Sequence, residues 1–156
     1  MKSLKKKLVA KGYVPVRLKM LNVPDLSSSF HLLVRVKLNG RKGNFILDTG
    51  ASTTVVDLSK AEKFKIKVPE VQPEMMAFGA SPEELEVEFS GGNKIRIKKW
   101  KGGKFPVLLM NISHIREAMQ LHEVEVDGIL GADVLIAGKA VLDYGAGYLY
   151  LKKTKK

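Results

Sequence analysis

The sequence lacks three features that would assign it to common protein classes. It contains no cysteine, so no disulfide framework can hold the chain together. No apolar run reaches the roughly 18 residues that a membrane-spanning helix needs, and we therefore expect no membrane segment. The basic start, residues 1–11, does not contain the apolar segment of a signal peptide. These absences favour a single cytoplasmic domain, for which 156 residues is an ordinary length.

Signals for metal and phosphate binding are also missing. The three histidines, His31, His114 and His122, are far apart in the sequence and lack a set of partnering ligands. The glycines of residues 145–147 precede a strand pattern rather than a helix pattern, which argues against a phosphate-binding loop. We therefore expect no metal and no cofactor.

Acidic residues are few relative to basic ones. The chain has 27 Lys and Arg against 16 Asp and Glu, which gives a net charge of +11. The basic residues cluster at both ends and in residues 94–104, where Trp100 stands among them. A basic surface favours anionic partners at low salt, and an aromatic ring among lysines can stack on bases. We favour the simpler interpretation, in which the ends and the strand face are merely solvated, and we expect no nucleic-acid partner.

Alternation of apolar and polar residues predicts strands along much of the chain. It is clear over residues 13–21, 32–38 and 85–89, with the period of two that half-buried strands have. Pro15 restricts the first of these strands to a sheet edge or a strand start. Asn39-Gly40 predicts a hairpin turn.

Helices are predicted to be short, and glycines predict further turns. Residues 57–64 have the spacing of a capping box and predict a short helix. Residues 112–121 carry apolar side chains at helical spacing. Glycines at 91–92 and 102–103 predict turns between strands. The predicted fold class is therefore mainly β with short helices.

One motif in this pattern points to chemistry. Phe45-Ile46-Leu47 is followed by Asp48-Thr49-Gly50-Ala51, and Val55-Val56 then resumes the strand pattern. A carboxylate at the end of a buried strand is costly unless it is paired or used. The tight turn after it needs the conformational freedom of glycine. Asp48 is therefore a candidate for a functional role rather than a packing role.

Two later segments complete a resemblance to a known family. Residues 127–133 read Asp-Gly-Ile-Leu-Gly-Ala-Asp, an apolar strand before a short helix, and residues 140–151 have the pattern of a closing hairpin. In this order and spacing, Asp48-Thr49-Gly50-Ala51 and these segments resemble the retropepsin-like aspartic peptidases. The resemblance covers roughly residues 30–152. It implies a closed acid-protease barrel with short helices and one lobe per chain.

The resemblance also implies a domain organisation. A retropepsin-like peptidase domain would occupy residues 13–152. Residues 1–12 would form a basic N-terminal tail, and residues 153–156 a basic C-terminal tail.

The activity implied by the resemblance is that of an aspartic endopeptidase. Asp48 would be the catalytic acid, supported by Thr49 and Gly50. Because the motif occurs once, a homodimer would supply the second carboxylate, and a water between the two Asp48 side chains would attack a peptide or protein substrate. Ala51 would contact the substrate, as would the tip of a hairpin flap at Phe78-Gly79-Ala80-Ser81.

Two alternatives need weighing. Leu142-Asp143-Tyr144-Gly145 echoes the motif, but only 11 residues follow Gly145, too few for a second lobe. We therefore expect Asp143 to start a hairpin turn. The alternative function is a catalytically silent module of the same fold that binds peptides or holds partners together. The substrate and its cleavage site are left open by the sequence.

Overall fold

The structure is a computed structural model that describes residues 2–23, 29–70 and 87–154. In chain order its elements are α1 (Leu4–Ala10), β1 (Tyr13–Arg17), β2 (Lys19–Val23), β3 (Ser29–Leu38), β4 (Arg41–Leu47), β5 (Val55–Asp57), the 3-10 helix η1 (Leu58–Lys60), β6 (Glu88–Ile97), β7 (Trp100–Met110), α3 (Ser113–Gln120), β8 (Gly128–Leu130), α4 (Ala132–Ala137), β9 (Val141–Asp143) and β10 (Tyr148–Lys152).

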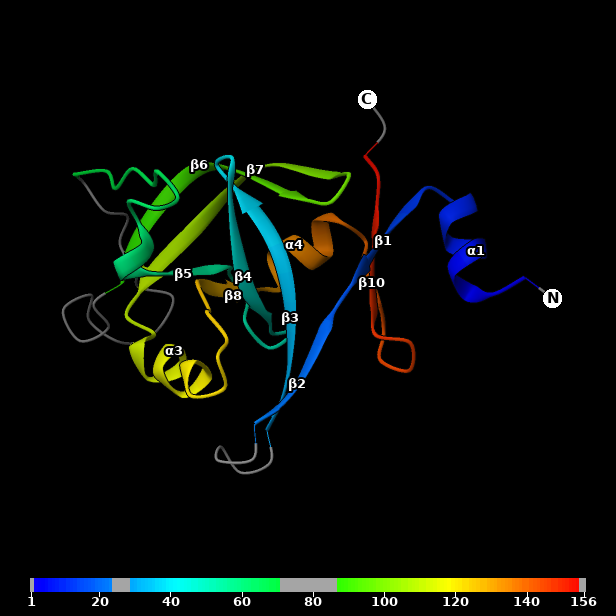
Figure 1. Cartoon of the computed structure of the whole chain (residues 1–156). Helices are drawn as coiled ribbons and strands as arrows, with labels where there is room; N and C mark the ends of the chain where they lie inside the picture. Colours follow the sequence, from blue (N-terminus) through cyan, green and yellow to red (C-terminus); the bar gives the residue numbers. More distant parts are fainter. Residues whose placement is uncertain (1, 24–28, 71–86, 155–156) are drawn as a thin grey trace.

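Most of these strands form one closed barrel. The larger sheet has the order β2-β3-β4-β8-β5-β7-β6, and a further pairing of β3 with β6 closes the ring (Figure 1). The described strands β1, β10 and β9 form a separate antiparallel sheet in that order. The predicted mainly β, closed-barrel fold is confirmed. Within the described residues, no helix is both long enough and apolar enough to cross a bilayer.

The strand that carries the motif is buried on both faces. Phe45 and Leu47 point into the cluster that fills the barrel, together with Trp100. Ile46 points the other way, into a second cluster that includes Met119 of α3. Burial on both faces explains why β4 ends in an unbroken apolar run rather than an alternating one.

Several local predictions are confirmed. Asn39 and Gly40 both have positive φ, 49° and 82°, as a two-residue hairpin turn between β3 and β4 requires. Pro15 lies in β1, which is an edge strand of its sheet. Residues 113–120 form α3, and β9 pairs with β10 as a hairpin.

The single strand predicted over residues 13–21 is wrong. These residues form two strands, because β1 pairs with β10 while β2 pairs with β3.

The turns predicted at two glycine pairs are wrong. β6 continues through Gly91 and Gly92, where the pairing with β7 shifts between Ser90 and Asn93. Gly92 has a φ of +72°, and the side-chain amide Nδ2 of the buried Asn93 donates to the Ser90 carbonyl at 3.0 Å. These glycines therefore make a bulge inside a long strand. Gly102-Gly103 lies within β7 in the same way.

The helix predicted at residues 57–64 is much shorter in the structure and is of the 3-10 kind. Asp57 ends β5, and only the 3-10 helix η1 follows it. The Asp57 carboxylate is buried and accepts hydrogen bonds from the Ser59 hydroxyl and, at 3.1 Å, from the Ile112 amide. A long-range bond to the start of α3 thus fixes the chain here, and sequence spacing cannot reveal it.

Residues 4–10 of the predicted basic tail form a helix. The Ser3 hydroxyl accepts a hydrogen bond from the Lys6 amide at 3.3 Å and so caps α1. No residue of α1 is buried. The Lys5 ammonium lies 4.7 Å above the Tyr148 ring, which connects the helix to β10.

Candidate active site

Asp48 lies at the end of β4, where two parallel strands finish together. β4 pairs with β8 in parallel, with Leu47 opposite Leu130. The Asp48 amide continues this ladder and donates to the Leu130 carbonyl at 3.0 Å. The carboxyl ends of parallel strands meet at one sheet edge, so the residues after β4 and after β8 come together there.

The turn after Asp48 orients its carboxylate. The Gly50 amide donates to the Asp48 carboxylate oxygen Oδ1 at 2.9 Å, and the Ala51 amide donates to the Asp48 carbonyl at 3.2 Å. A Cβ atom at Gly50 would lie 3.3 Å from the same Oδ1, so a larger residue would crowd this contact. Asp48, Thr49 and Gly50 are all exposed. The acid is thus held in one direction and remains open to solvent.

The chain after β8 locks the loop that follows Asp48. The Ala132 amide donates to the Ala51 carbonyl at 2.7 Å. Gly131 packs so closely that an added Cβ would lie 2.8 Å from this carbonyl oxygen and equally close to the Thr53 backbone. Gly131 therefore permits a backbone contact that any side chain would block.

A buried polar network holds the two segments together. The Thr54 hydroxyl accepts from the Gly131 amide at 3.1 Å and donates to Asp133 Oδ1 at 2.8 Å. The other Asp133 oxygen accepts from the Thr54 amide at 3.1 Å. Thr54 is 1% exposed, so water cannot replace these hydrogen bonds and the groups must satisfy one another. Sequence reasoning assigned neither residue a role, since the bond joins positions far apart in the chain.

We expect Thr54→Val to destabilise the protein by about 1 to 3 kcal/mol, because valine has a similar shape but leaves the buried Gly131 amide without this acceptor and removes the hydroxyl donor to Asp133 Oδ1. The measurement is the free energy of unfolding in urea. Thr54→Ser is the matched control, because it keeps the hydroxyl and should retain most of the stability. Equal losses in the two variants would show that packing of the methyl group matters and the network does not.

Asp127 is a structural acid. It is 1% exposed, and its Oδ2 accepts from the Asn44 amide at 2.9 Å. Its Oδ1 lies 2.9 Å from the Lys63 ammonium. These contacts anchor the start of β8 to β4, and they leave the carboxylate paired and out of reach of solvent.

A pocket of about 360 Å³ lies beside Asp48 and Thr49. Its walls combine apolar side chains with polar groups and come from β3, β4, α3, β8 and the β9–β10 hairpin. The remaining lining residues are Phe30, His31, Leu32, Ile46, Leu47, Ile115, Ile129, Leu142 and Tyr144. Phe30 and Tyr144 are about 60% exposed although they are large and apolar (62% and 61%). A pocket that presents apolar side chains next to an oriented carboxylate can receive the apolar side chains of an extended chain.

Sequence reasoning missed these pocket residues. The sequence raises His31 only as a possible metal ligand, yet His31 lies on the wall beside Asp48. Phe30 carries no signal in the sequence, and Tyr144 stands out only in the echo of the motif at Asp143. Local turn signals predict the β3–β4 and β9–β10 hairpins, but they do not show that these hairpins line a pocket beside Asp48.

Thr49 also borders a second pocket, on the side of α4. That pocket has a volume of about 360 Å³ and is lined by Leu135, Ile136 and Leu142 among others. Ile136 is 76% exposed. The motif therefore lies between two hollows, and within residues 2–23, 29–70 and 87–154 both are open to the surface.

The remaining predicted site residues have mixed outcomes. Ala51 is half-buried, and its contacts here are with the backbone around Gly131. The predicted flap tip, Phe78 to Ser81, lies outside the described residues. Asp143 does start the hairpin turn, because its carboxylate accepts from the Ala146 amide at 3.0 Å. Among the residues that the structure describes, no group of three or more His, Asp or Glu could hold a metal ion.

Comparisons with known proteins agree with this geometry. The family model described as aspartyl protease matches residues 34–134, well over half of the chain. A retropepsin-like aspartic protease from Rickettsia conorii has a similar structure, with a TM-score of 0.56, 17% identity and 90% of each chain covered. The retroviral protease-like domain of Ddi1 from Leishmania major matches with a TM-score of 0.52 and 17% identity, over 80% of this chain and 90% of that one. No curated protein matches the sequence significantly. The chain therefore belongs to the aspartyl protease family and has the retropepsin-like fold.

Proposed function

We propose that this protein is an aspartic endopeptidase whose active site forms between two copies of the chain. The observation that carries the proposal is the exposed Asp48 carboxylate, oriented by the Gly50 amide at 2.9 Å. The sequence contains Asp-Thr-Gly once, so one chain supplies one such acid. A second copy would place its own Asp48 opposite the first.

The proposed mechanism follows from the charge of two adjacent carboxylates. Two such groups about 3 Å apart repel by about 5 kcal/mol at an effective dielectric constant near 20. The pair therefore retains one proton. The ionised Asp48 would take a proton from a water held between the two acids. The protonated Asp48 would donate a hydrogen bond to the scissile carbonyl as the water attacks it.

The surroundings of Asp48 support a dimer and a peptide substrate. Thr49 and the exposed Ile136 of α4 border an apolar hollow that a second copy could cover. On the other side, Phe30 and Ile129 line the pocket next to Asp48, which would receive an apolar side chain of the substrate. No metal or nucleotide takes part in this chemistry.

Hydrolysis of a mixed peptide library tests the proposal. We expect cleavage at a restricted set of peptide bonds flanked by apolar residues, identified by mass spectrometry of the products after incubation at several pH values. Library peptides that bind without being cut, at protein concentrations where the dimer is present, would favour the silent peptide-binding module instead. Solution mass, measured on the same samples, shows whether the dimer is present.

A further inference from the structure

A strongly basic face lies on the barrel, away from Asp48. The pairing of strands places Lys42 of β4 opposite Lys37 of β3, and Lys37 opposite Arg96 of β6. Arg96 in turn lies opposite Lys101 of β7. At the usual spacing of neighbouring strands, this row of four cations spans about 14 Å. We call these four residues, with Arg35 and Lys98, the basic face.

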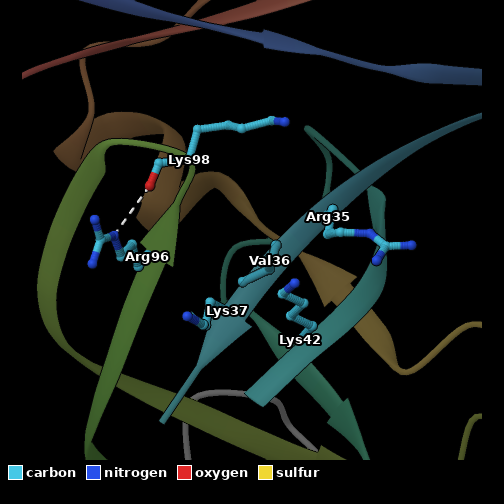
Figure 2. Close-up of a pocket in the computed structure, with 6 residues that line it drawn as sticks. All are labelled: Arg35, Val36, Lys37, Lys42, Arg96 and Lys98. Carbon is cyan, nitrogen blue, oxygen red and sulfur yellow. Dashed lines mark hydrogen bonds between the residues drawn. The ribbon is translucent and has the colours of Figure 1, made fainter. Parts of the chain in front are cut away.

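The basic face surrounds a hollow between the strands. The β3–β6 pairing involves only Lys37–Arg96 and Leu38–Ile95, so the two strands separate beyond it. A pocket of about 370 Å³ opens there, lined by five cations and the buried Val36 (Figure 2). Figure 2 shows the Arg96 guanidinium nitrogen Nε donating to the Lys98 carbonyl, at 3.1 Å, which orients this side chain.

The cations of the basic face have no acidic partner in the described part of the chain. The ion pairs found there use Lys60, Lys63 and Arg116 as their cations. All six residues of the basic face are exposed. Like charges directly opposite each other on neighbouring strands destabilise a sheet. An anionic ligand would relieve this repulsion, so the arrangement points to a bound polyanion.

The composition of the face narrows the class of polyanion. In the described residues 35–42 and 94–104, no large apolar side chain is exposed, because Val36, Leu38, Ile95, Ile97 and Trp100 are all buried. A surface that binds a protein usually carries aromatic or apolar anchors. A surface that binds a membrane usually carries apolar side chains that insert into the lipid. A row of cations alone suits a ligand with regularly spaced charges.

We propose that the basic face binds the phosphate backbone of a nucleic acid without reading its sequence. Trp100 is fully buried, and its indole nitrogen donates to the Lys152 carbonyl at 3.0 Å, so it cannot stack on bases. Recognition therefore rests on charge. Taken alone, the basic residues of 94–104 favour a merely solvated strand face. What changes the interpretation is that Lys37 and Lys42, from a distant part of the sequence, extend the same row.

This binding would be separate from peptide hydrolysis. Lys42 lies six positions before Asp48, a distance of about 20 Å at the rise of an extended strand. Loss of peptidase activity would therefore leave the proposal about the basic face unaffected, and the reverse also holds.

Fluorescence anisotropy with labelled oligonucleotides of mixed sequence, single-stranded and duplex, tests the proposal. We expect wild-type protein to bind at low salt, with an affinity that falls steeply as salt rises, by about 0.9 in the log–log slope for each phosphate neutralised on duplex. The triple variant Lys37→Gln, Arg96→Gln, Lys101→Gln should bind at least about tenfold more weakly and lower the slope by about 3. The single variant Lys37→Gln should lower it by about 1.

A matched control removes the same charge elsewhere. The triple variant Lys2→Gln, Lys6→Gln, Lys7→Gln neutralises three exposed lysines in and beside α1, a helix that Figure 1 shows outside the barrel, beyond β1 and β10. This control variant should keep the wild-type slope of affinity against salt. Absence of binding at low salt, or equal losses in the two triple variants, would overturn the proposal. Polyglutamate that competes as well per charge as the oligonucleotide would point to an acidic protein partner instead.

Discussion

Asp48→Asn is expected to abolish peptide hydrolysis while the fold and the self-association of the chain persist. Asparagine has nearly the same shape, and its amide oxygen can still accept the Gly50 hydrogen bond that orients Asp48. It cannot take a proton from water. Losing general acid–base catalysis alone typically costs a factor of about 10² to 10⁴ in rate, and in a homodimer both acids are lost together. The measurement is kcat/KM on a peptide that the wild-type protein cleaves.

Asp143→Asn is the matched control for this prediction. Asp143 follows the same kind of apolar strand and precedes Tyr144 and Gly145, but its carboxylate caps the β9–β10 turn through the Ala146 amide at 3.0 Å. Its loss should cost some stability and leave kcat/KM nearly unchanged. Hydrolysis by Asp48→Asn within about tenfold of wild type would remove Asp48 from the mechanism. So would equal losses of activity in the two variants.

Mixing wild-type and Asp48→Asn chains in equal amounts is expected to leave about one quarter of the activity of the same total amount of wild type, because random pairing makes one quarter of the dimers fully wild type. If each chain acted alone, one half would remain. The chains must exchange fully before the assay, and sedimentation can verify that they do. Mixing wild type with Asp143→Asn is the control and should leave nearly full activity.

The same two-chain site makes activity depend on concentration. Specific activity should fall on dilution as the dimer dissociates by mass action. Thr49 is exposed beside the apolar hollow at α4, so Thr49→Ala should weaken the dimer and make this fall occur at a higher concentration. Constant specific activity down to a species shown to be monomeric would refute the shared site.

The sequence alone was enough to predict the family and the fold class, and it named Asp48 as the candidate catalytic acid. The reason is that these depend on local chemistry. Asp48 stands out because an acid ends an apolar strand and a glycine follows within the turn. Asn39-Gly40 and the closing hairpin are likewise set by turn residues next to each other in the chain. Apolar spacing at residues 112–121 predicted α3, since a helix face also repeats over a few residues.

The tertiary structure decided the features that join distant parts of the chain. The glycines at 91–92 looked like a turn, but the pairing of β6 with β7 made them a bulge. The 94–104 run looked like a polar strand face, and barrel closure put Trp100 in the core and brought Lys37 beside Arg96.

The surroundings of Asp48 were decided in the same way. The Thr54–Asp133 bond and the placement of His31 in the pocket both depend on which strands lie side by side. A local pattern tells which face of a strand is buried, but strand partners and their register are set by the packing of the whole barrel. The sequence therefore determined which residue is the candidate acid, Asp48, and the tertiary structure determined what supports it and what surrounds it.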